Sequence, residues 1–526
     1  MRAFAIQHCA PYSCVMIRST KTLLISLVLL VAGCATVDFD AEKTASQMIE
    51  DTSDTRFGEA IAPAIAEHPG QSGFHLMIES IDALAARLLL AGLAERTLDV
   101  QYYLIGDDPI GDIFFSSLLK AADRGVRVRL LIDDLGTVGL EDDLMALSDH
   151  PNIQLRLFNP FASRALRAFD AWDFRRLNRR MHNKSFTADN QMTIIGGRNI
   201  ATEYFALNPD YNFGDLDTLA IGPIVTETSR MFDSYWNHER AVPFHQLSQQ
   251  APDDGTRLNV IRASYADNLE ALKSTGYGDA VQASIDDYLD SDLSLYQWAD
   301  YELVFDSPDK NLIDESETAD SIRTPLAESI RSTTESFTLI SPYFVPRQAG
   351  IEAISRMQDN GIQVNVITNS LASSDHLLVY GGYAPVRKPL LEHGARIFEI
   401  RGDLDISGTE DAGTKGSKSS LHTKAFIVDR QYFFMGSFNW DPRSAFLNTE
   451  LGVIIDSKEI AAPLADRLVR SAPESSYEVF LNEQGKLRWR TIEAGEELIL
   501  DKEPDTGFWT RFFGGLSRLL PIESQL

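Results

Sequence analysis

Two stretches of the sequence carry the same pattern and decide the fold. Residues 182–189 read His-Asn-Lys-Ser-Phe-Thr-Ala-Asp, and residues 422–429 read His-Thr-Lys-Ala-Phe-Ile-Val-Asp. Both are H-x-K-x-x-x-x-D, and each is followed by a glycine step and an asparagine, Asn199 or Asn439. With this composition, chance would supply on the order of 0.02 copies of the pattern. Two intact copies therefore predict two related halves that share one active site.

The chain is long enough for two or more domains, and it is strongly acidic. It has 526 residues, of which 44% are hydrophobic and 24% charged, and its formal net charge is -28. A nucleic-acid enzyme usually gathers positive potential against phosphates, whereas this chain as a whole repels polyanions and anionic bilayers. We therefore expect no nucleic-acid partner. Contact with a phosphate-bearing substrate requires local basic clusters or a tether.

Such a tether is predicted at the N-terminus. Residues 22–33 form an apolar run that is too short to span a membrane as a mature helix, and Cys34 follows it directly. The pattern is typical of a signal peptide over residues 1–33, and its end resembles the bacterial lipobox, in which this cysteine is lipidated. An ordinary cleaved signal or a short N-terminal anchor is the alternative.

The cysteine content agrees with a lipid anchor. Cys34 is the only cysteine of the expected mature chain, so we expect neither a disulfide nor a cysteine metal site in it. By resemblance to lipoprotein sorting, Ala35 after the cysteine indicates the outer membrane. We therefore expect a membrane-anchored lipoprotein that faces the periplasm.

The order of strand-like and helix-like segments repeats along the chain. A strand, a helix and a strand are predicted in each half, at 97–103, 113–123 and 126–132, and again at 337–344, 351–359 and 362–368. This order predicts an α/β fold of two similar domains, each with a largely parallel sheet covered by helices.

The expected organisation follows from this repeat and from shifts in composition. It comprises the signal peptide (1–33), a lipid-anchored spacer (34–72), the first half (73–240), an acidic connection (241–320), the second half (321–505) and an amphipathic C-terminal tail (506–526). The tail is aromatic and basic, which suits docking at a bilayer surface, although an ordinary core helix is the alternative.

Each motif is predicted to lie on a strand, at 181–187 and 421–428. Side chains two residues apart share one face of a strand, so His182 and Lys184 are expected to point the same way, and the second motif follows the same rule. Asp189 and Asp429 then fall in turns. We expect these two aspartates to be structural.

Two histidines, two lysines and two asparagines can transfer a phosphoryl group without a metal. One histidine attacks phosphorus and the other protonates the leaving alcohol, while lysine and asparagine side chains hold the charged oxygens. No metal-ligand spacing such as H-x-H or H-E-x-x-H is present. Each imidazole also needs a partner at its far nitrogen. The candidates by spacing are Asp215, 33 residues after His182, with Asp217 as an equal competitor, and Glu450, 28 residues after His422.

The sequence resembles the phospholipase D superfamily, which is defined by two such motifs, each followed by G-(G/S)-x-N. Within it, the chain looks most like the bacterial cardiolipin synthases of the C type, and the resemblance runs from about residue 68 to residue 523. It implies two domains related by pseudo-two-fold symmetry, one active site at their interface, no cofactor, and a covalent phosphatidyl-histidine intermediate. The catalytic residues that it implies are His182 as nucleophile, His422 as acid and then base, Lys184, Lys424, Asn199, Asn439, and Asp215 and Glu450 as orienting groups.

The substrate class is the part that the motifs leave open. A basic cluster before the first motif is either a solvated face or a collar for lipid headgroups; it consists of Arg175, Arg176, Arg179 and Arg180. The resemblance favours a phosphatidyltransferase that makes cardiolipin from phosphatidylglycerol and a second phospholipid, phosphatidylglycerol or phosphatidylethanolamine. The alternatives are a hydrolytic phospholipase D that releases phosphatidic acid and a membrane-tethered phosphodiesterase or nuclease. A tethered scaffold would have lost a motif residue, and none is lost.

Overall fold

The computed structural model describes residues 37–40, 42–164, 167, 170, 173–248, 253, 255–312, 321–403 and 418–518. The predicted signal peptide and Cys34 lie outside these residues. In the described part of the chain, no helix is both long and apolar enough to cross a bilayer.

The first half is built on eight strands. Their order in the sheet is β9-β4-β3-β2-β5-β6-β8-β1. The strands are β1 (Ser72–Met77), β2 (Thr97–Leu104), β3 (Arg127–Gly136), β4 (Ile153–Phe158), β5 (Ser185–Ala188), β6 (Met192–Gly196), β8 (Asp217–Ile221) and β9 (Ala241–Pro243).

The second half repeats this order strand for strand. Its sheet runs β18-β13-β12-β11-β15-β16-β17-β10, and the hairpin of β19 and β20 extends it at β18. The strands are β10 (Gln297–Phe305), β11 (Ser336–Ile340), β12 (Gln363–Asn369), β13 (Arg396–Ile400), β15 (Ala425–Val428), β16 (Tyr432–Gly436), β17 (Leu451–Asp456), β18 (Ser476–Leu481), β19 (Leu487–Glu493) and β20 (Glu496–Leu500). Equal strand order in two consecutive halves is the signature of an internal duplication.

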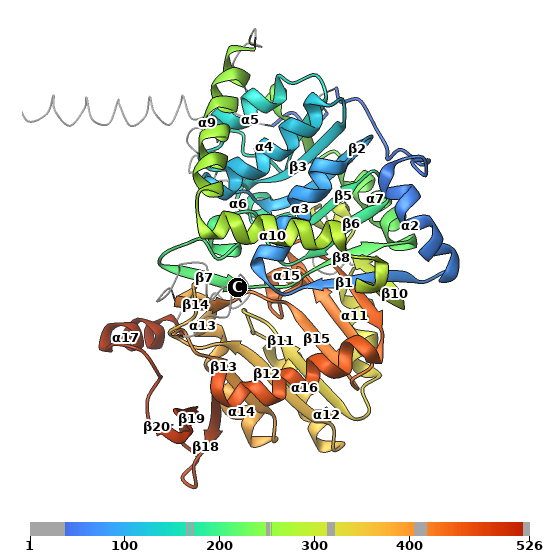
Figure 1. The fold of residues 1–526 in the computed structure, drawn as a ribbon. Helices are drawn as coiled ribbons and strands as arrows, with labels where there is room; N and C mark the ends of the chain where they lie inside the picture. Colours follow the sequence, from blue (N-terminus) through green and yellow to red (C-terminus); the bar gives the residue numbers. More distant parts are fainter. Residues whose placement is uncertain are drawn as a thin grey trace, which may run out of the picture.

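The two halves meet along matching edges. Strand β1 pairs antiparallel with β10, so both sheets join into one, and Figure 1 shows the first half above and the second below this boundary. A second link is the parallel pair of β7 (Tyr211–Gly214) and β14 (Lys418–Leu421). Each link joins a strand of one half to a strand of the other. The expected pair of α/β domains with pseudo-two-fold symmetry is therefore confirmed.

The expectation of a largely parallel sheet was wrong. Only β2, β3 and β4, and likewise β11, β12 and β13, run parallel, while the remaining pairings in each half are antiparallel. The motifs contribute to this, because each ends in a three-residue hairpin turn whose first two residues have positive φ: Asp189 and Asn190 in the first, Asp429 and Arg430 in the second. Such a tight turn joins only antiparallel neighbours.

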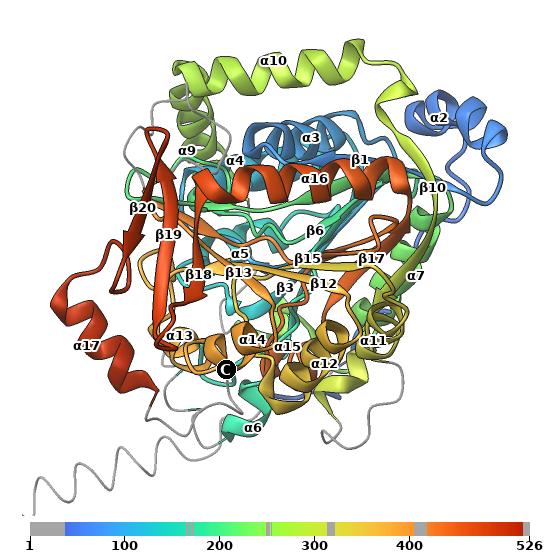
Figure 2. The same cartoon turned by 90° about the horizontal axis from the view of Figure 1, so that it is seen from below.

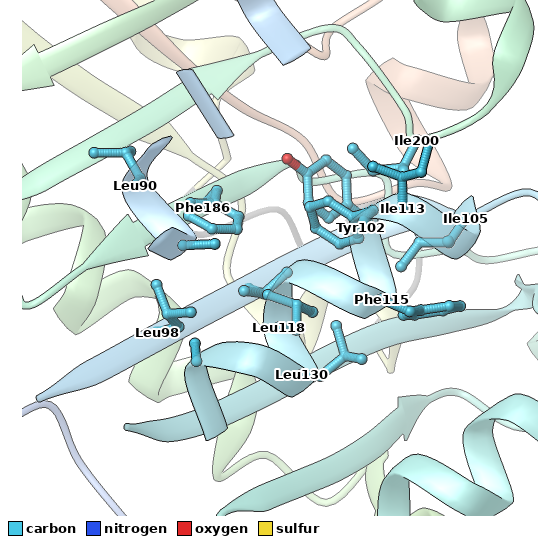
Figure 3. Packing of buried hydrophobic residues seen from close by; sticks show 14 of the residues in the cluster. Leu90, Leu98, Tyr102, Ile105, Ile113, Phe115, Leu118, Leu130, Phe186 and Ile200 are labelled. Carbon is cyan, nitrogen blue, oxygen red and sulfur yellow. The ribbon is translucent and has the colours of Figure 1, made fainter. Parts of the chain in front are cut away.

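The core of the first half lies between its sheet and the helices on one face. Leu98 and Tyr102 of β2 alternate along the strand and meet Phe115 and Leu118 of α4, with Phe186 of the motif strand beside them (Figure 3). All five are buried. Truncating one such phenylalanine to alanine costs about 3–5 kcal/mol of stability. This packing fixes β5 and therefore the position of the motif that contains it.

Helices cover both halves. In the first half and the connection they are α2 (Arg56–Glu67), α3 (Ser80–Leu93), α4 (Pro109–Asp123), α5 (Glu141–Ser148), α6 (Phe174–Leu177), α7 (Pro223–Trp236), α8 (Phe244–Leu247), α9 (Thr256–Lys273) and α10 (Gly276–Asp290). In the second half they are α11 (Arg323–Arg331), α12 (Arg347–Asp359), α13 (Leu377–Tyr383), α14 (Arg387–Glu392), α15 (Pro442–Phe446), α16 (Lys458–Ser475) and α17 (Phe508–Ser517). Short 3-10 turns are η2 (Thr202–Tyr204), η3 (Leu293–Leu295) and η4 (Pro308–Asn311).

Two segments expected as connectors belong to the halves themselves. In the stretch 241–320, α9 packs on α4 and α10 on α3, as Figure 2 shows for α10, and β10 is a strand of the second sheet. In the stretch 34–72, the backbone N–H groups of Ser46 and Met48 donate to Asn237 and Asp233 at the end of α7. Composition alone marks these segments as polar, but contacts with the rest of the chain bind α9, α10 and the stretch 34–72 to the first half and β10 to the second.

Candidate active site

The first motif histidine is held by the second half of the chain. The backbone N–H of His182 donates to the carbonyl of Thr449 at 2.9 Å, and Met181 forms a β-bridge with Thr449. This places the next residue, Glu450, at the imidazole, with 2.8 Å between His182 Nδ1 and Glu450 Oε2. The ring of Tyr103 lies edge-on to His182, with 5.1 Å between the ring centroids.

The second histidine is held by the first half in the same manner. The backbone N–H of His422 donates to the carbonyl of Gly214 at 2.8 Å, at the end of the β7–β14 pair. The next residue, Asp215, then contacts the imidazole, with 2.5 Å between Asp215 Oδ2 and His422 Nδ1. Tyr204 lies edge-on to the ring, with 5.0 Å between centroids.

The carboxylates are therefore exchanged between the halves. Spacing along the chain had associated each carboxylate with the histidine of its own half, and the structure crosses the pairs. The competitor Asp217 is not a histidine partner, because its carboxylate accepts from Arg87 Nη2 at 2.9 Å and also pairs with Arg198. The two aspartates are only two residues apart, and sequence spacing does not separate them.

The glycine step after each motif has a packing reason that differs between the halves. A Cβ added to Gly197 would lie 2.4 Å from Asp215 Oδ1, so only glycine leaves room for that carboxylate. The equivalent residue of the second half is Ser437, whose hydroxyl donates to Glu450 Oε2 at 2.5 Å. A second hydroxyl, that of Ser444, donates to Glu450 Oε1 at 2.7 Å. The sequence interpretation had missed both serines, although the G-S-x-N form of the second motif pointed to the first.

The motif lysines fold back toward their histidines. Both precede the strands, which start at Ser185 and Ala425, so the expected strands over 181–187 and 421–428 begin too early. Lys184 Nζ donates to the carbonyl of His182 at 2.6 Å. Lys424 Nζ lies 2.8 Å from His422 Nδ1. Each lysine therefore lies beside the histidine of its own motif, although neither residue is part of a strand.

Burial keeps both histidines neutral in the free protein. It lowers the pKa of His182 to about 4, against the opposing charge of Glu450 and with the help of Lys184. It lowers the pKa of His422 to about 4 as well, with the help of Lys424 and against Asp215. Among the described residues neither imidazole has a hydrogen-bond partner at Nε2. A neutral imidazole held at Nδ1 is ready to act as a nucleophile or a base at Nε2.

The lysine of each motif acts electrostatically on the histidine of the other motif. Lys424 lowers the pKa of His182 and Lys184 lowers that of His422, although each lysine belongs to the opposite motif. Burial lowers the pKa of Lys184 to about 7 and that of Lys424 to about 8. An anion that enters this site restores the charged form of both lysines, because opposite charges stabilise each other in a buried setting.

The two motif asparagines are buried and each leaves one atom without a partner. Oδ1 of Asn199 and Oδ1 of Asn439 make no hydrogen bond, whereas Asn199 Nδ2 donates to the hydroxyl of Tyr204 at 2.9 Å. A buried amide oxygen without a partner is uncommon and needs an explanation. The two unpaired acceptor atoms stand at equivalent positions of the two halves.

The motif aspartates lie at the far ends of the motif strands. Asp189 accepts from the backbone N–H groups of Glu95, Arg96 and Thr97 at 2.7–2.9 Å. Asp429 accepts from those of Thr334, Glu335 and Ser336 at matching places in the second half. Both carboxylates tie the hairpin to the start of β2 or β11.

The four arginines before the first motif do not form one exposed collar. Arg180 is buried and pairs with Asp133 at 3.1 Å, and buried Arg179 donates to the carbonyl of Lys310 at 2.8 Å. Arg176 donates to Asp173 and Asn159, and only Arg175 is exposed. Most of this cluster therefore contributes to internal structure.

Comparisons with known proteins identify the family. A family model described as "Cardiolipin synthase, PLD-like domain" matches residues 90–236 and 326–471, one match for each half. Cardiolipin synthase C of Escherichia coli is 41% identical over 89% of this chain and 99% of that protein. The chain belongs to the phospholipase D-like cardiolipin synthase family. It is a phospholipase D-type phosphatidyltransferase.

More distant relatives extend this family assignment. Cardiolipin synthase A of Buchnera aphidicola is 26% identical, over 71% of this chain and 64% of that protein. Among solved structures, a phosphatidylserine synthase from Haemophilus influenzae superposes with a TM-score of 0.53 at 13% identity, covering 79% of this chain and 91% of that one. At this identity the superposition shows a shared fold alone.

The described residues were also searched for groups of ligands that could hold a metal ion. No cluster of three or more His, Cys, Asp and Glu side chains is found among them.

Proposed function

We propose that this family member makes cardiolipin by joining two phospholipids through His182. In the first step, His182 Nε2 attacks the phosphorus of phosphatidylglycerol or phosphatidylethanolamine. The P–O bond to glycerol or ethanolamine breaks, and His422 Nε2 gives its proton to the departing oxygen. The negative phosphodiester raises the pKa of His422 from its low value in the free protein, so that the imidazolium is available.

The second step reverses the proton movement. The terminal glycerol hydroxyl of a phosphatidylglycerol gives its proton to His422 as its oxygen attacks phosphorus. The P–N bond then breaks, and His182 is restored. Lys184, Lys424, Asn199 and Asn439 hold the non-bridging oxygens in both transition states.

One observation carries this proposal: each catalytic imidazole is fixed at Nδ1 by a carboxylate from the opposite half. Glu450 thereby stabilises the positive charge that develops on His182 when it bonds to phosphorus, and Asp215 stabilises the His422 imidazolium. Because each histidine takes its carboxylate from the opposite half, one complete site needs both halves of the chain.

A membrane location follows from the substrate and from two features of the chain. We propose that lipidation of Cys34 anchors the protein to the outer membrane, facing the periplasm, and that α17 lies in the bilayer surface. The apolar side of α17 is half or more exposed at Phe508, Trp509 and Phe512. Its other side packs against α13, where a Cβ on Gly381 would meet Ser517. A helix with an aromatic outer face suits an interfacial position.

Of the arginines before the first motif, we propose Arg175 for headgroup contact, since it alone is exposed. The net charge of -28 disfavours nucleic acid as a substrate.

Product analysis tests the proposal. Purified protein is incubated with mixed phosphatidylglycerol and phosphatidylethanolamine in vesicles, and products are identified by mass. Cardiolipin is the expected product. Phosphatidic acid alone would assign the protein to the hydrolytic phospholipases D instead, and no product would contradict an active site at the motifs.

A further inference from the structure

The second half contains a largely apolar pocket close to the motif residue Asn439 in sequence. This pocket of about 440 Å³ opens between α11, α12 and α15, which Figure 2 shows gathered on one side of this half. Its apolar walls include Leu326, Ile330, Val345, Phe438, Trp440 and Phe446. The volume is within the range of pockets that bind small ligands.

Three arginines line this apolar pocket: Arg323, Arg331 and Arg347. None of them forms an ion pair with a carboxylate of the described residues, in a protein of net charge -28. The single acid in the lining, Asp441, accepts from the backbone N–H of Ser444 and caps α15. Unpaired guanidinium groups in an apolar pocket favour an anionic ligand.

Two of these arginines are held ready for such a ligand. The guanidinium carbons of Arg323 and Arg347 lie 4.5 and 5.0 Å from the ring centroid of Phe446. Nη1 of Arg323 is buried and has no hydrogen-bond partner. Arg347 has a φ of 50°, which is rare for a residue with a side chain and persists where the surroundings fix it.

The pocket borders the segment that carries Asn439. Phe438 and Trp440, which line it, flank the motif residue Asn439. The backbone of Trp440 is fixed on both sides, because its N–H donates to Ser341 Oγ at 3.0 Å and its carbonyl accepts from Val345 at 2.8 Å. A ligand in this pocket therefore lies next to the segment that presents Asn439 to the reacting phosphate.

We propose that this pocket binds an anionic phospholipid, with its phosphate between Arg323 and Arg347 and an acyl chain along the apolar wall. The identity of the occupant rests on the proposed function: it is the acceptor phosphatidylglycerol. A lipid held in this way has its phosphorus away from the histidines, so only its free glycerol end can reach the phosphatidyl-histidine. A zwitterionic lipid fits less well, because its ammonium group would face the same arginines.

Binding is measured through Trp440. A soluble short-chain phosphatidylglycerol with brominated acyl chains should quench this tryptophan saturably, and the saturable part should vanish in Trp440→Phe. The double variant Arg323→Gln/Arg347→Gln should bind at least about tenfold more weakly, since it loses two charge-assisted contacts. The matched control is Arg356→Gln, a change at an exposed arginine on α12, the helix that also carries Arg347. Glycerol phosphate, which has no chain, should not compete.

Equal affinity of the double variant and the wild type would overturn the pocket assignment. So would quenching that persists unchanged in Trp440→Phe, or full competition by glycerol phosphate. These outcomes do not depend on turnover, so they remain decisive even if the protein were to make no cardiolipin.

Turnover then tests the acceptor role. In the double variant, cardiolipin formation should need about tenfold more phosphatidylglycerol, while ethanolamine release from phosphatidylethanolamine alone stays at the level of the Arg356→Gln control. An equal loss of both activities would contradict an acceptor site and assign the pocket to the donor lipid instead.

Discussion

The exchange of carboxylates between the halves gives the sharpest prediction. Replacing Glu450 by Gln should impair His182, and replacing Asp215 by Asn should impair His422. Both changes keep the size and shape of the side chain and remove its charge. If each carboxylate instead served the histidine of its own half, the two effects would be interchanged.

The magnitude can be worked from the contacts. In each case one buried charge-assisted hydrogen bond to an imidazole becomes a neutral one, at 2.8 Å for Glu450 and 2.5 Å for Asp215. Hydrogen bonds to charged groups contribute about 1.5–3 kcal/mol, which corresponds to about 10- to 150-fold in rate. The imidazolium forms in the reaction, so the loss falls on the rate constant rather than on substrate binding.

The assay compares two donor lipids that differ in their leaving group. Glycerol leaves phosphatidylglycerol only with a proton from His422, whereas p-nitrophenol leaves a phosphatidyl nitrophenyl ester without one. Glu450→Gln should slow the first step with both donors. Asp215→Asn should slow it with phosphatidylglycerol and leave the burst of nitrophenol nearly unchanged. Thermal unfolding of both variants serves as the control for folding.

The reverse result would refute the reasoning. A nitrophenol burst that is lost in Asp215→Asn and kept in Glu450→Gln would contradict the crossed pairing with His182 as the nucleophile. Equal loss in both variants with normal thermal unfolding would mean that the two carboxylates do not act on separate histidines.

Three further predictions concern the charge, the metal requirement and the membrane contact of the protein. Affinity for a soluble phosphodiester anion should fall as the pH rises from 7 to 9. Lys184 and Lys424, with pKa values of about 7 and 8, bind the anion in their charged forms and lose their protons in this window. A dissociation constant that stays constant from pH 6 to 9 would contradict this prediction. EDTA should leave cardiolipin formation unchanged, and a loss that added metal restores would overturn the metal-free mechanism. The membrane contact is tested in a Cys34→Ala background, where Trp509→Glu together with Phe512→Glu should lower binding to lipid vesicles about tenfold or more in a sedimentation assay. The reason is that two exposed apolar side chains are replaced by anions. Unchanged sedimentation would exclude α17 as a membrane contact.

Much of the fold could be predicted because it is repeated. Two copies of the motif in matching contexts indicated two halves, and the tight turns at Asp189 and Asp429 were readable from residue type. The mixed direction of the strands was not predicted, although the same hairpins determine it. Strand β10 was assigned to the connection because its neighbours in sequence are polar helices, while its pairing partner β17 lies far along the chain.

For the site, the sequence identified the chemical groups but not their contacts. Spacing made Asp215 and Asp217 equal candidates, and they differ only in which buried partners they meet: His422 for one, Arg87 and Arg198 for the other. The crossed pairing depends on the bridges that carry Thr449 to His182 and Gly214 to His422. Such contacts join residues more than 200 positions apart, and a single sequence holds no measure of them.

The covalent intermediate on His182 tests the central claim most directly. His422→Ala should let the nitrophenyl donor phosphatidylate the protein and then stall, because no base activates the acceptor. Peptide mass spectrometry of the quenched variant should then find the phosphatidyl group on His182. A group attached to any other residue, or no adduct although nitrophenol is released in a burst, would contradict one site built from two halves with His182 as its nucleophile.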